Sequence, residues 1–272
     1  MPELPEVETI KNQLIKYLPL EVLAVKYSKV SSSILKTKEF SPKGKTIKSI
    51  SRKGKLLNFH LSEKQNILSH LGMSGSWRIS KIKIQEKHTH ILLECLNKKK
   101  EKIFLGYVDP RRFGNMYFLK EANTHSHLNR LRVDISTKEF NEKYLYEVFQ
   151  KFPNKLLKPF LLDQKYFAGC GNYIANEICA LAKILPTRLC KNISKNDCKN
   201  ILKATKSVIE GSIKNNGLTF AGGYVDAFGE KGMGVLNLVV FNQKICGICN
   251  NNTITKIELG KRGTYFCKVC QF

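Results

Sequence analysis

Two pairs of cysteines near the end of the chain place the strongest constraint on its fold. Cys246 and Cys249 form one C-x-x-C pair, Cys267 and Cys270 form a second, and 17 residues separate the pairs. Each pair can bind one side of an ion, so two pairs complete a tetrahedral Zn²⁺ site. Four thiolates leave no open coordination position, and the expected role of one bound Zn²⁺ is therefore structural. The alternatives are two disulfides, which a reducing compartment disfavours, and coincidence.

The length and the start of the chain limit its class. At about 150 residues per domain, 272 residues predict roughly two domains. The sequence has no run of 18 apolar residues to cross a bilayer, and its composition is that of a globular protein. The opening, MPELPEVETI, is acidic where a secretory signal would be basic and then apolar, so we expect an intracellular, cytoplasmic protein with no membrane partner. The cysteines outside the two pairs are expected to be small buried hydrophobic residues; they are Cys95, Cys170, Cys179, Cys190 and Cys198.

The charge balance points to a polyanionic partner. The chain carries 46 Lys and Arg against 22 Asp and Glu, a net charge of +24. We interpret this as binding to nucleic acid, which would place the protein at the nucleoid. The alternative is a lysine-rich surface that reflects only a biased genome composition.

The spacing of apolar residues predicts successive parts. An amphipathic helix is expected from Leu4 to Leu18, followed by β-rich runs from about Leu20 to Leu119 that predict an antiparallel sandwich or barrel. The β-rich runs include Thr46 to Ile50, Leu56 to Leu61, His90 to Leu96 and Ile103 to Val108. After a polar stretch, 121–130, helices are expected over Phe140 to Phe149, Leu156 to Leu162, Ile174 to Leu185 and Cys198 to Ile213. A segment with glycines at 217, 222, 223, 229, 232 and 234 and an apolar strand from Leu236 to Phe241 precede the cysteine-bearing tail.

The first residues can act as a chemical reagent. A methionine followed by proline is normally trimmed, which would leave the secondary amine of Pro2 free. An α-amino group titrates near about pH 8, so a useful fraction is nucleophilic at neutral pH. Such an amine can attack the anomeric carbon of a sugar to give an iminium ion, while the carboxyl group of Glu3 or Glu6 moves protons. The alternative is that the glutamates of this segment only complement the helix dipole, with Pro5 at the first helical position.

Five motifs taken together resemble one family. They are MPELPEVET at the start, HLGMSG at His70 to Gly75, DPRRFG at Asp109 to Gly114, AGCGN at Ala168 to Asn172, and RGTYFCKVCQ at the end. In this order, over essentially the whole chain, they resemble the formamidopyrimidine-DNA glycosylases, bifunctional repair enzymes for oxidised purines. The resemblance implies an α+β multidomain fold with DNA between domains. Its parts are an N-terminal catalytic helix with a β-sandwich (1–128), a helix-two-turns-helix domain with a lesion-capping loop (129–235) and a zinc-ribbon finger (236–272).

The resemblance also implies an activity and a partner. The family excises 8-oxoguanine and formamidopyrimidines opposite cytosine from duplex DNA, then acts as an apurinic/apyrimidinic lyase in base excision repair. Pro2 matches the nucleophile that forms a Schiff base with deoxyribose, Glu3 matches the general acid/base, and β and δ elimination then cut the strand. An enzyme with one such site is expected to be a monomer.

Further residues match DNA contacts of the family. Lys55 matches a catalytic lysine that grips phosphate at the lesion, and Lys158 matches a lysine associated with processing 8-oxoguanine. Asn172 and Arg262 match phosphate clamps, and His90 is placed with the DNA-binding residues.

Three residues match the wedge that fills the hole left by the extruded base: Met73, Arg111 and Phe113. Extrusion costs about a few kcal/mol, so an apolar side chain and a ring should replace lost stacking while the arginine hydrogen-bonds the orphaned cytosine. Without the family, Met73 and Phe113 would be interpreted as core residues.

The chain also departs from the family pattern. Tyr173 and Ile174 stand in reversed order, and Gly234 and Val235 replace an aromatic residue and a glutamine in the capping loop, Gly217 to Asn237, so lesion preference can differ. The stretch Leu131 to Ser136 lacks two prolines, and the turn Asn250 to Thr253 carries one extra residue.

Two other functions stay open at this point. One is that of the sister family that removes oxidised pyrimidines, endonuclease VIII, against which Leu4, Met73 and the D-P-R-R-F motif speak. The other is a non-catalytic DNA-binding module with a zinc ribbon.

Overall fold

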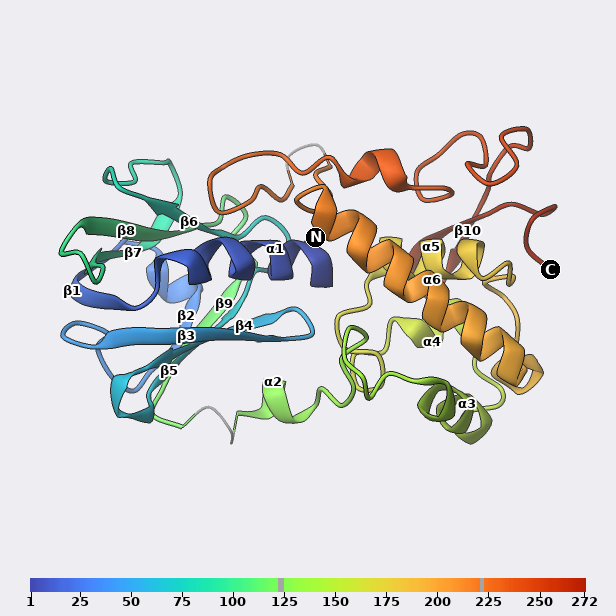
Figure 1. Ribbon diagram of the computed structural model, residues 1–272, viewed down its shortest axis with the longest axis horizontal. Coiled ribbons are helices and arrows are strands. Elements are labelled where there is room, and N and C mark those ends of the chain that lie inside the picture. The colour runs from blue at the N-terminus through green and yellow to red at the C-terminus, as the bar shows by residue number, and fades with distance from the viewer. Residues whose placement is uncertain (122–124, 221–222) are drawn as a thin grey trace. The chain divides into compact units, whose positions relative to one another are not determined.

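The computed structural model of the protein describes residues 1–121, 125–220 and 223–272. The chain forms two compact units, each coloured by residue number in Figure 1. Unit 1 consists of Met1–Asn129 and Ile213–Met233, and unit 2 consists of Arg130–Ser212 and Gly234–Phe272.

A nine-stranded sheet forms the framework of unit 1 within the described residues, in the order β2-β9-β5-β4-β3-β1-β7-β8-β6. Its strands are β1 (Leu20–Tyr27), β2 (Leu35–Lys38), β3 (Thr46–Lys53), β4 (Leu56–Leu61), β5 (Asn66–His70), β6 (Ser76–Ser80), β7 (Thr89–Leu96), β8 (Lys102–Val108) and β9 (Asn115–Leu119). All the predicted β-rich runs are confirmed as strands. The pairing is antiparallel except at the edge, where β2 runs parallel to β9, so the expectation of a purely antiparallel sheet is wrong there.

The sheet is joined in its middle by a short contact. β1 and β3 pair only at Leu20 with Ile47 and at Glu21 with Thr46. The strands on either side of this contact form the two layers of the predicted sandwich, because their apolar side chains share one core.

Helix α1 (Leu4–Leu14) runs along this sheet and contributes Val7, Ile10 and Leu14 to its core. The helix begins where the periodicity predicts and ends four residues early, continuing as a 3-10 turn over Ile15–Tyr17. Leu18, which precedes Pro19, is extended, because a proline disfavours helical geometry in the residue before it, so no helix continues beyond Tyr17.

Unit 2 contains the helical region. Its helices are α3 (Glu142–Lys151), α4 (Leu157–Leu161), α5 (Asn172–Leu181) and α6 (Lys195–Lys214), the last of which runs on into unit 1; α2 (Ser126–Asn129) belongs to unit 1. The remaining 3-10 turns are Ser31–Ser33, Ser62–Lys64, Cys190–Asn192 and Gly234–Asn237. Phe149, Phe160 and Phe167 pack ring against ring in the core of the unit. The predicted helices are confirmed, although α5 ends before Leu185 because Lys183 adopts a left-handed φ of 59°.

The expected strand from Leu236 to Phe241 is wrong. Its first residues form the 3-10 turn, and the backbone N–H groups of Val239, Val240 and Phe241 all donate to the buried Glu177 carboxylate at 2.8–3.0 Å. A side chain on α5 thus takes the place of a neighbouring strand, which apolar sequence alone does not reveal.

The tail of unit 2 forms the expected hairpin, with β10 (Thr255–Leu259) paired to β11 (Arg262–Phe266). The two units group parts of the chain that are far apart in sequence. Residues 213–233 belong with the sandwich, and the tail belongs with the helices.

Two sequence-based observations concern residues outside the described ones, namely part of the polar stretch at 122–124 and the glycine at 222. Among the described residues, none of the helices has the length and apolarity needed to cross a membrane.

Candidate functional site

The amino terminus of unit 1 is held by the start of α1. Pro2 and Glu3 are buried. Glu3 caps the helix, since its side chain accepts the Glu6 backbone N–H while Glu6 Oε2 accepts the Glu3 N–H at 2.7 Å. This reciprocal pair fixes the carboxyl group of Glu3 at the first turn of α1.

Charged groups surround the terminal amine, which is that of Met1 in this structure. Burial lowers its pKa from the ordinary value of 8.0, and the positive charges of Lys55 and Arg111 act in the same direction, whereas Glu3 and Glu6 oppose the change. A lowered pKa leaves more of the amine unprotonated and nucleophilic at neutral pH. The structure thus brings both predicted catalytic side chains, Glu3 and Lys55, to the amino terminus.

Lys55 reaches this cluster from the turn between β3 and β4, and its side chain is buried. Arg52 anchors the turn, because its Nε donates to Glu8 Oε2 at 2.7 Å and its Nη1 donates to the Gly54 carbonyl at 2.9 Å. The ion pair between Arg52 and Glu8 therefore fixes the turn that carries Lys55 to α1.

The three predicted wedge residues lie on two adjoining turns of unit 1. Met73 is 37% exposed and Phe113 is 52% exposed, so neither is a core residue. The Arg111 guanidinium lies 4.8 Å from the centre of the Phe113 ring. Gly72 has a φ of 66°, and a Cβ there would lie 2.4 Å from the Phe113 carbonyl carbon, so only glycine permits this close approach of the turns.

Asp109 ties the two wedge turns together, a role that the sequence did not reveal. The Asp109 side chain is fully buried, and it accepts the Ser74 hydroxyl at Oδ1 (2.7 Å) and the Gly114 N–H at Oδ2 (2.8 Å). The only sequence signal is its place before a proline within the D-P-R-R-F-G motif.

His90, expected to contact DNA, supports these turns from inside. It is buried, its Nε2 pairs with the Asp109 carbonyl at 3.0 Å, and its Nδ1 pairs with Ser28 Oγ at 3.0 Å. Both ring nitrogens are therefore engaged within the protein.

On unit 2, Lys158 occupies an interior position. Its side chain is 0% exposed, and Nζ donates to Asn172 Oδ1 at 2.7 Å and to the Gly263 carbonyl at 3.3 Å. Asn172 Nδ2 donates to the same carbonyl at 3.1 Å. The lysine therefore orients Asn172 instead of presenting its own charge at the surface.

Asn172 and the exposed Arg262 are the predicted phosphate contacts of this unit. Asn172 is the first residue of α5, where backbone N–H groups favour an anion. Arg262 opens β11, and Asn176 of α5 accepts the Tyr265 N–H at 2.7 Å. The hairpin that carries the arginine is thus fixed to the helix that carries the asparagine.

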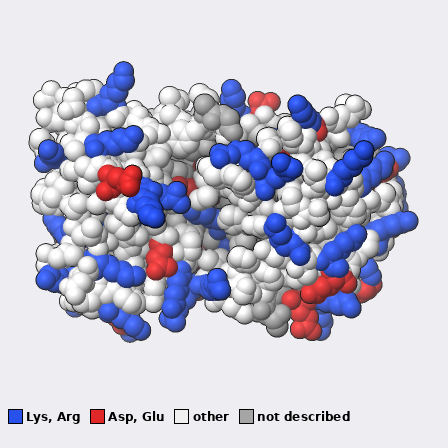
Figure 2. Space-filling model, turned by 180° about the vertical axis from the view of Figure 1, so that it is seen from behind, with Lys and Arg blue, Asp and Glu red and all other residues white. Residues whose placement is uncertain are grey.

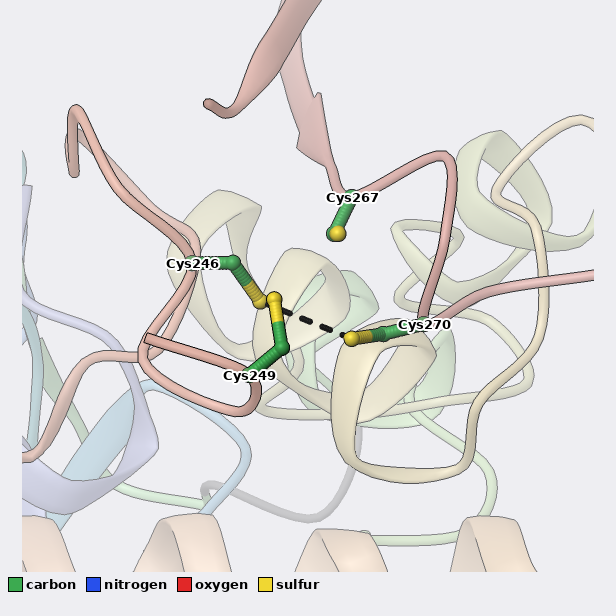
Figure 3. A group of neighbouring side chains, drawn as sticks. All are labelled: Cys246, Cys249, Cys267 and Cys270. Carbon is green, nitrogen blue, oxygen red and sulfur yellow. Dashed lines mark hydrogen bonds between the residues drawn. The ribbon is translucent and has the colours of Figure 1, made fainter. Parts of the chain in front are cut away.

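The four predicted metal ligands converge from two loops of unit 2, as Figure 3 shows. Their sulfur atoms all lie within 4.8 Å of one another, and those of Cys246 and Cys270 are 3.9 Å apart. Tetrahedral Zn²⁺ with bonds of 2.3 Å requires sulfur atoms about 3.8 Å apart. Backbone and side-chain N–H groups of Ile248 and Asn252 also donate to Cys246 and Cys249. The group can therefore hold a metal ion.

Comparison with known proteins decides the family. Residues 1–116 match the family model for the formamidopyrimidine-DNA glycosylase N-terminal domain, and residues 131–221 match that for the formamidopyrimidine-DNA glycosylase H2TH domain. The chain belongs to the formamidopyrimidine-DNA glycosylase family. The glycosylase of Oceanobacillus iheyensis is 35% identical, with 100% of this chain and 98% of the relative covered. That of Proteus mirabilis is 36% identical over the same shares of both chains.

Solved structures agree with this family assignment. The Lactococcus lactis Fpg in complex with abasic-site DNA is similar with a TM-score of 0.86 and 28% identity, and 100% of each chain is covered. The MutM (Fpg) protein of Thermus thermophilus gives 0.85 and 26%, with 99% and 98% covered. The expected α+β fold and the expected enzyme class, a DNA glycosylase and apurinic/apyrimidinic lyase of base excision repair, are confirmed.

Proposed function

We propose that this glycosylase excises oxidised purines, 8-oxoguanine and formamidopyrimidines, from duplex DNA opposite cytosine and then cuts the strand. The nucleophile is the secondary amine of Pro2 after Met1 has been removed. The substrate places its action at chromosomal DNA in the cytoplasm, and one active site needs no second subunit.

The chemistry uses the groups at the start of α1. The Pro2 nitrogen bonds to C1′ of the deoxyribose, the bond from C1′ to the base breaks, and the base leaves with that electron pair and a proton. Glu3 gives a proton to the ring oxygen as the sugar opens to the iminium ion. Loss of a C2′ proton then expels the 3′ phosphate, and a second elimination expels the 5′ phosphate.

One observation carries the proposal. The terminal amine of Met1, one residue before Pro2, lies among the charges of Glu3, Glu6, Lys55 and Arg111, and burial lowers its pKa. Arg111 is also in contact with the Phe113 ring of the wedge. An amine suited to attack a sugar is thus linked through one arginine to an exposed apolar pair suited to replace an extruded base.

Further residues support DNA binding on each unit. Lys55, Asn172 and Arg262 are offered to phosphates. Lys158 orients Asn172 from inside, and His90 supports the wedge turns through the Asp109 carbonyl. On the face seen in Figure 2, Lys and Arg outnumber Asp and Glu, as the net charge of +24 leads one to expect. The four cysteines fit Zn²⁺, which would stabilise the hairpin that carries Arg262.

The test uses labelled duplexes and the processed protein. 8-oxoguanine and dihydrouracil are each placed opposite cytosine and opposite adenine, and the cut ends are analysed. The proposal predicts fastest cutting at 8-oxoguanine opposite cytosine, with phosphate left on both ends of the gap. Preference for dihydrouracil would instead indicate a pyrimidine-specific enzyme, and tight binding without any cut would indicate a non-catalytic module.

A further inference from the structure

Helix α1 has a second buried face, and this face is polar. Glu6 and Gln13 lie on it seven residues apart, which is close to two helical turns. Glu6 Oε1 accepts the Leu218 N–H at 2.9 Å, and Gln13 Oε1 accepts the Ala227 N–H at 2.8 Å. The glycine-rich segment is therefore bonded to the catalytic helix at both Leu218 and Ala227.

The Gln13 amide uses both of its polar atoms toward this segment. While its oxygen accepts from Ala227, its Nε2 donates to Asp226 Oδ2 at 2.7 Å. Gln13 and Asp226 are both buried. Water poorly replaces a hydrogen-bond partner that is lost at this buried site, so losing one of these hydrogen bonds costs more free energy than losing one at the surface.

Asp226 in turn shapes the tip of the segment. Its Oδ1 accepts the N–H groups of Phe228 and Glu230 at 2.9 and 2.8 Å. The Ile79 N–H donates to the Ala227 carbonyl at 2.9 Å, which joins the turn to β6 at the edge of the sheet. Phe228, at the tip, is 48% exposed. One carboxylate thus connects the helix to a rigid turn with an exposed ring.

We propose that Gln13 and Asp226 are positioning residues for base excision. Their pair fixes the turn 226–230, which lies within the described residues 223–237 of the segment that the resemblance leads us to expect over an extruded purine. This inference rests on the function proposed above. Gln13 lies about 13 Å along the helix from Leu4, so its replacement leaves Pro2 and Glu3 in place. An abasic site has no base to cover, so cutting there needs the amine and not the pair.

The donor and acceptor pattern of the pair can be inverted. Gln13→Glu places a carboxylate against Asp226 and removes the donor, so the two like charges repel. In the double variant Gln13→Glu with Asp226→Asn, the new asparagine Nδ2 donates to the new glutamate. The other glutamate oxygen still accepts from Ala227, and the asparagine oxygen still accepts from Phe228 and Glu230. The hydrogen bonds are thereby restored in reverse.

The experiment compares two rates in each full-length protein. Single-turnover excision of 8-oxoguanine opposite cytosine is measured beside cutting of a preformed abasic site, and circular dichroism verifies folding. The variants are Gln13→Glu, Asp226→Asn and the double variant. Asn12→Asp is the control, since it makes the same amide-to-acid change one residue away on α1.

For each single variant, excision should fall roughly tenfold or more, the effect of losing one hydrogen bond to a charged group, while abasic-site cutting stays within about twofold. The excision rate of the double variant should return to within about threefold of the wild-type rate, and the excision rate of Asn12→Asp should equal that of the wild type.

Three results would overturn the inference: unchanged excision in both single variants, an equal fall of both rates, or no recovery in the double variant. If one single variant fails to fold, the rates of the other single variant and of the double variant still test the inference. If the wild-type protein cuts neither substrate, the proposed function itself fails, which is a different outcome.

Discussion

Replacing Asp109 by alanine removes a buried side chain that joins the two wedge turns. Its carboxylate accepts the Ser74 hydroxyl at 2.7 Å and the Gly114 N–H at 2.8 Å, and the side chain is fully buried. Both donors would lose their partner inside the protein. The turns that carry Met73 and Phe113 would then be joined by the weaker hydrogen bond from the Arg111 N–H to Ser74 Oγ (3.2 Å) and by the close packing at Gly72.

The size of the effect follows from these two bonds. A hydrogen bond to a charged group contributes about 1.5–3 kcal/mol, so the free energy of unfolding of unit 1 should fall by roughly 3 kcal/mol or more. For a unit of this size the melting temperature should fall by about 6 °C or more. Asp109→Asn should lose far less, since a serine hydroxyl can accept as well as donate. The asparagine amide can therefore donate to Ser74 while its oxygen accepts from Gly114.

The assay pairs stability with activity. Thermal unfolding is followed by circular dichroism, and cutting is measured at 8-oxoguanine in a duplex and at an abasic site in a single strand, where no base must be extruded. Asp109→Ala should lose duplex activity more than single-strand activity, and Asp109→Asn should keep most of both. A melting temperature for Asp109→Ala within about 2 °C of the wild type, or an asparagine variant no better than alanine, would refute the reasoning.

Three other perturbations test separate parts of the structure. Burial, with the charges of Lys55 and His127, lowers the pKa of His70 from 6.5 to about 4. As the pH falls, His70 is therefore protonated in the unfolded chain before it is protonated in the folded protein, and the free energy of unfolding should fall by about 3 kcal/mol from pH 6.5 to 4. Urea unfolding should show a smaller decrease over this pH range in His70→Gln than in the wild type. An equal decrease in both proteins would contradict this assignment. Cys267→Ser should release the bound metal, measured by a chromogenic chelator, and weaken DNA binding for every sequence; unchanged affinity would show that the hairpin is dispensable. Arg111→Ala should reduce the preference for cytosine opposite the lesion, whereas Lys55→Ala should weaken binding whatever the opposite base. If competition binding shows that Arg111→Ala loses the same affinity with every opposite base, the wedge role of Arg111 is wrong.

Local patterns in the sequence were sufficient for much of the architecture. The C-x-x-C pairs predicted the sulfur cluster because metal ligation imposes a fixed short spacing. Alternating apolar residues located the strands, and three-and-four spacing located α1 and the helices of unit 2. Motifs on short turns, such as HLGMSG, also placed Met73 at the surface once the family was considered.

Contacts between distant residues could not be predicted in this way. Gln13 meets Asp226 across 213 positions, and Glu177 meets Val239 across 62. A buried polar partner leaves no periodic signal at either end, so the apolar run before the tail favoured a strand that tertiary bonds exclude. Likewise, a lysine expected at the DNA surface, Lys158, lies wholly inside, where Asn172 Oδ1 and the Gly263 carbonyl accept hydrogen bonds from its ammonium group.

Borohydride trapping identifies the nucleophilic nitrogen. The processed protein is mixed with duplex DNA that carries 8-oxoguanine opposite cytosine, the imine is reduced, and the cross-linked peptide is sequenced by mass spectrometry. We expect a single adduct, on the nitrogen of Pro2, and no adduct in a protein that retains Met1. An adduct on a lysine such as Lys55, or strand cutting with no adduct at all, would contradict it.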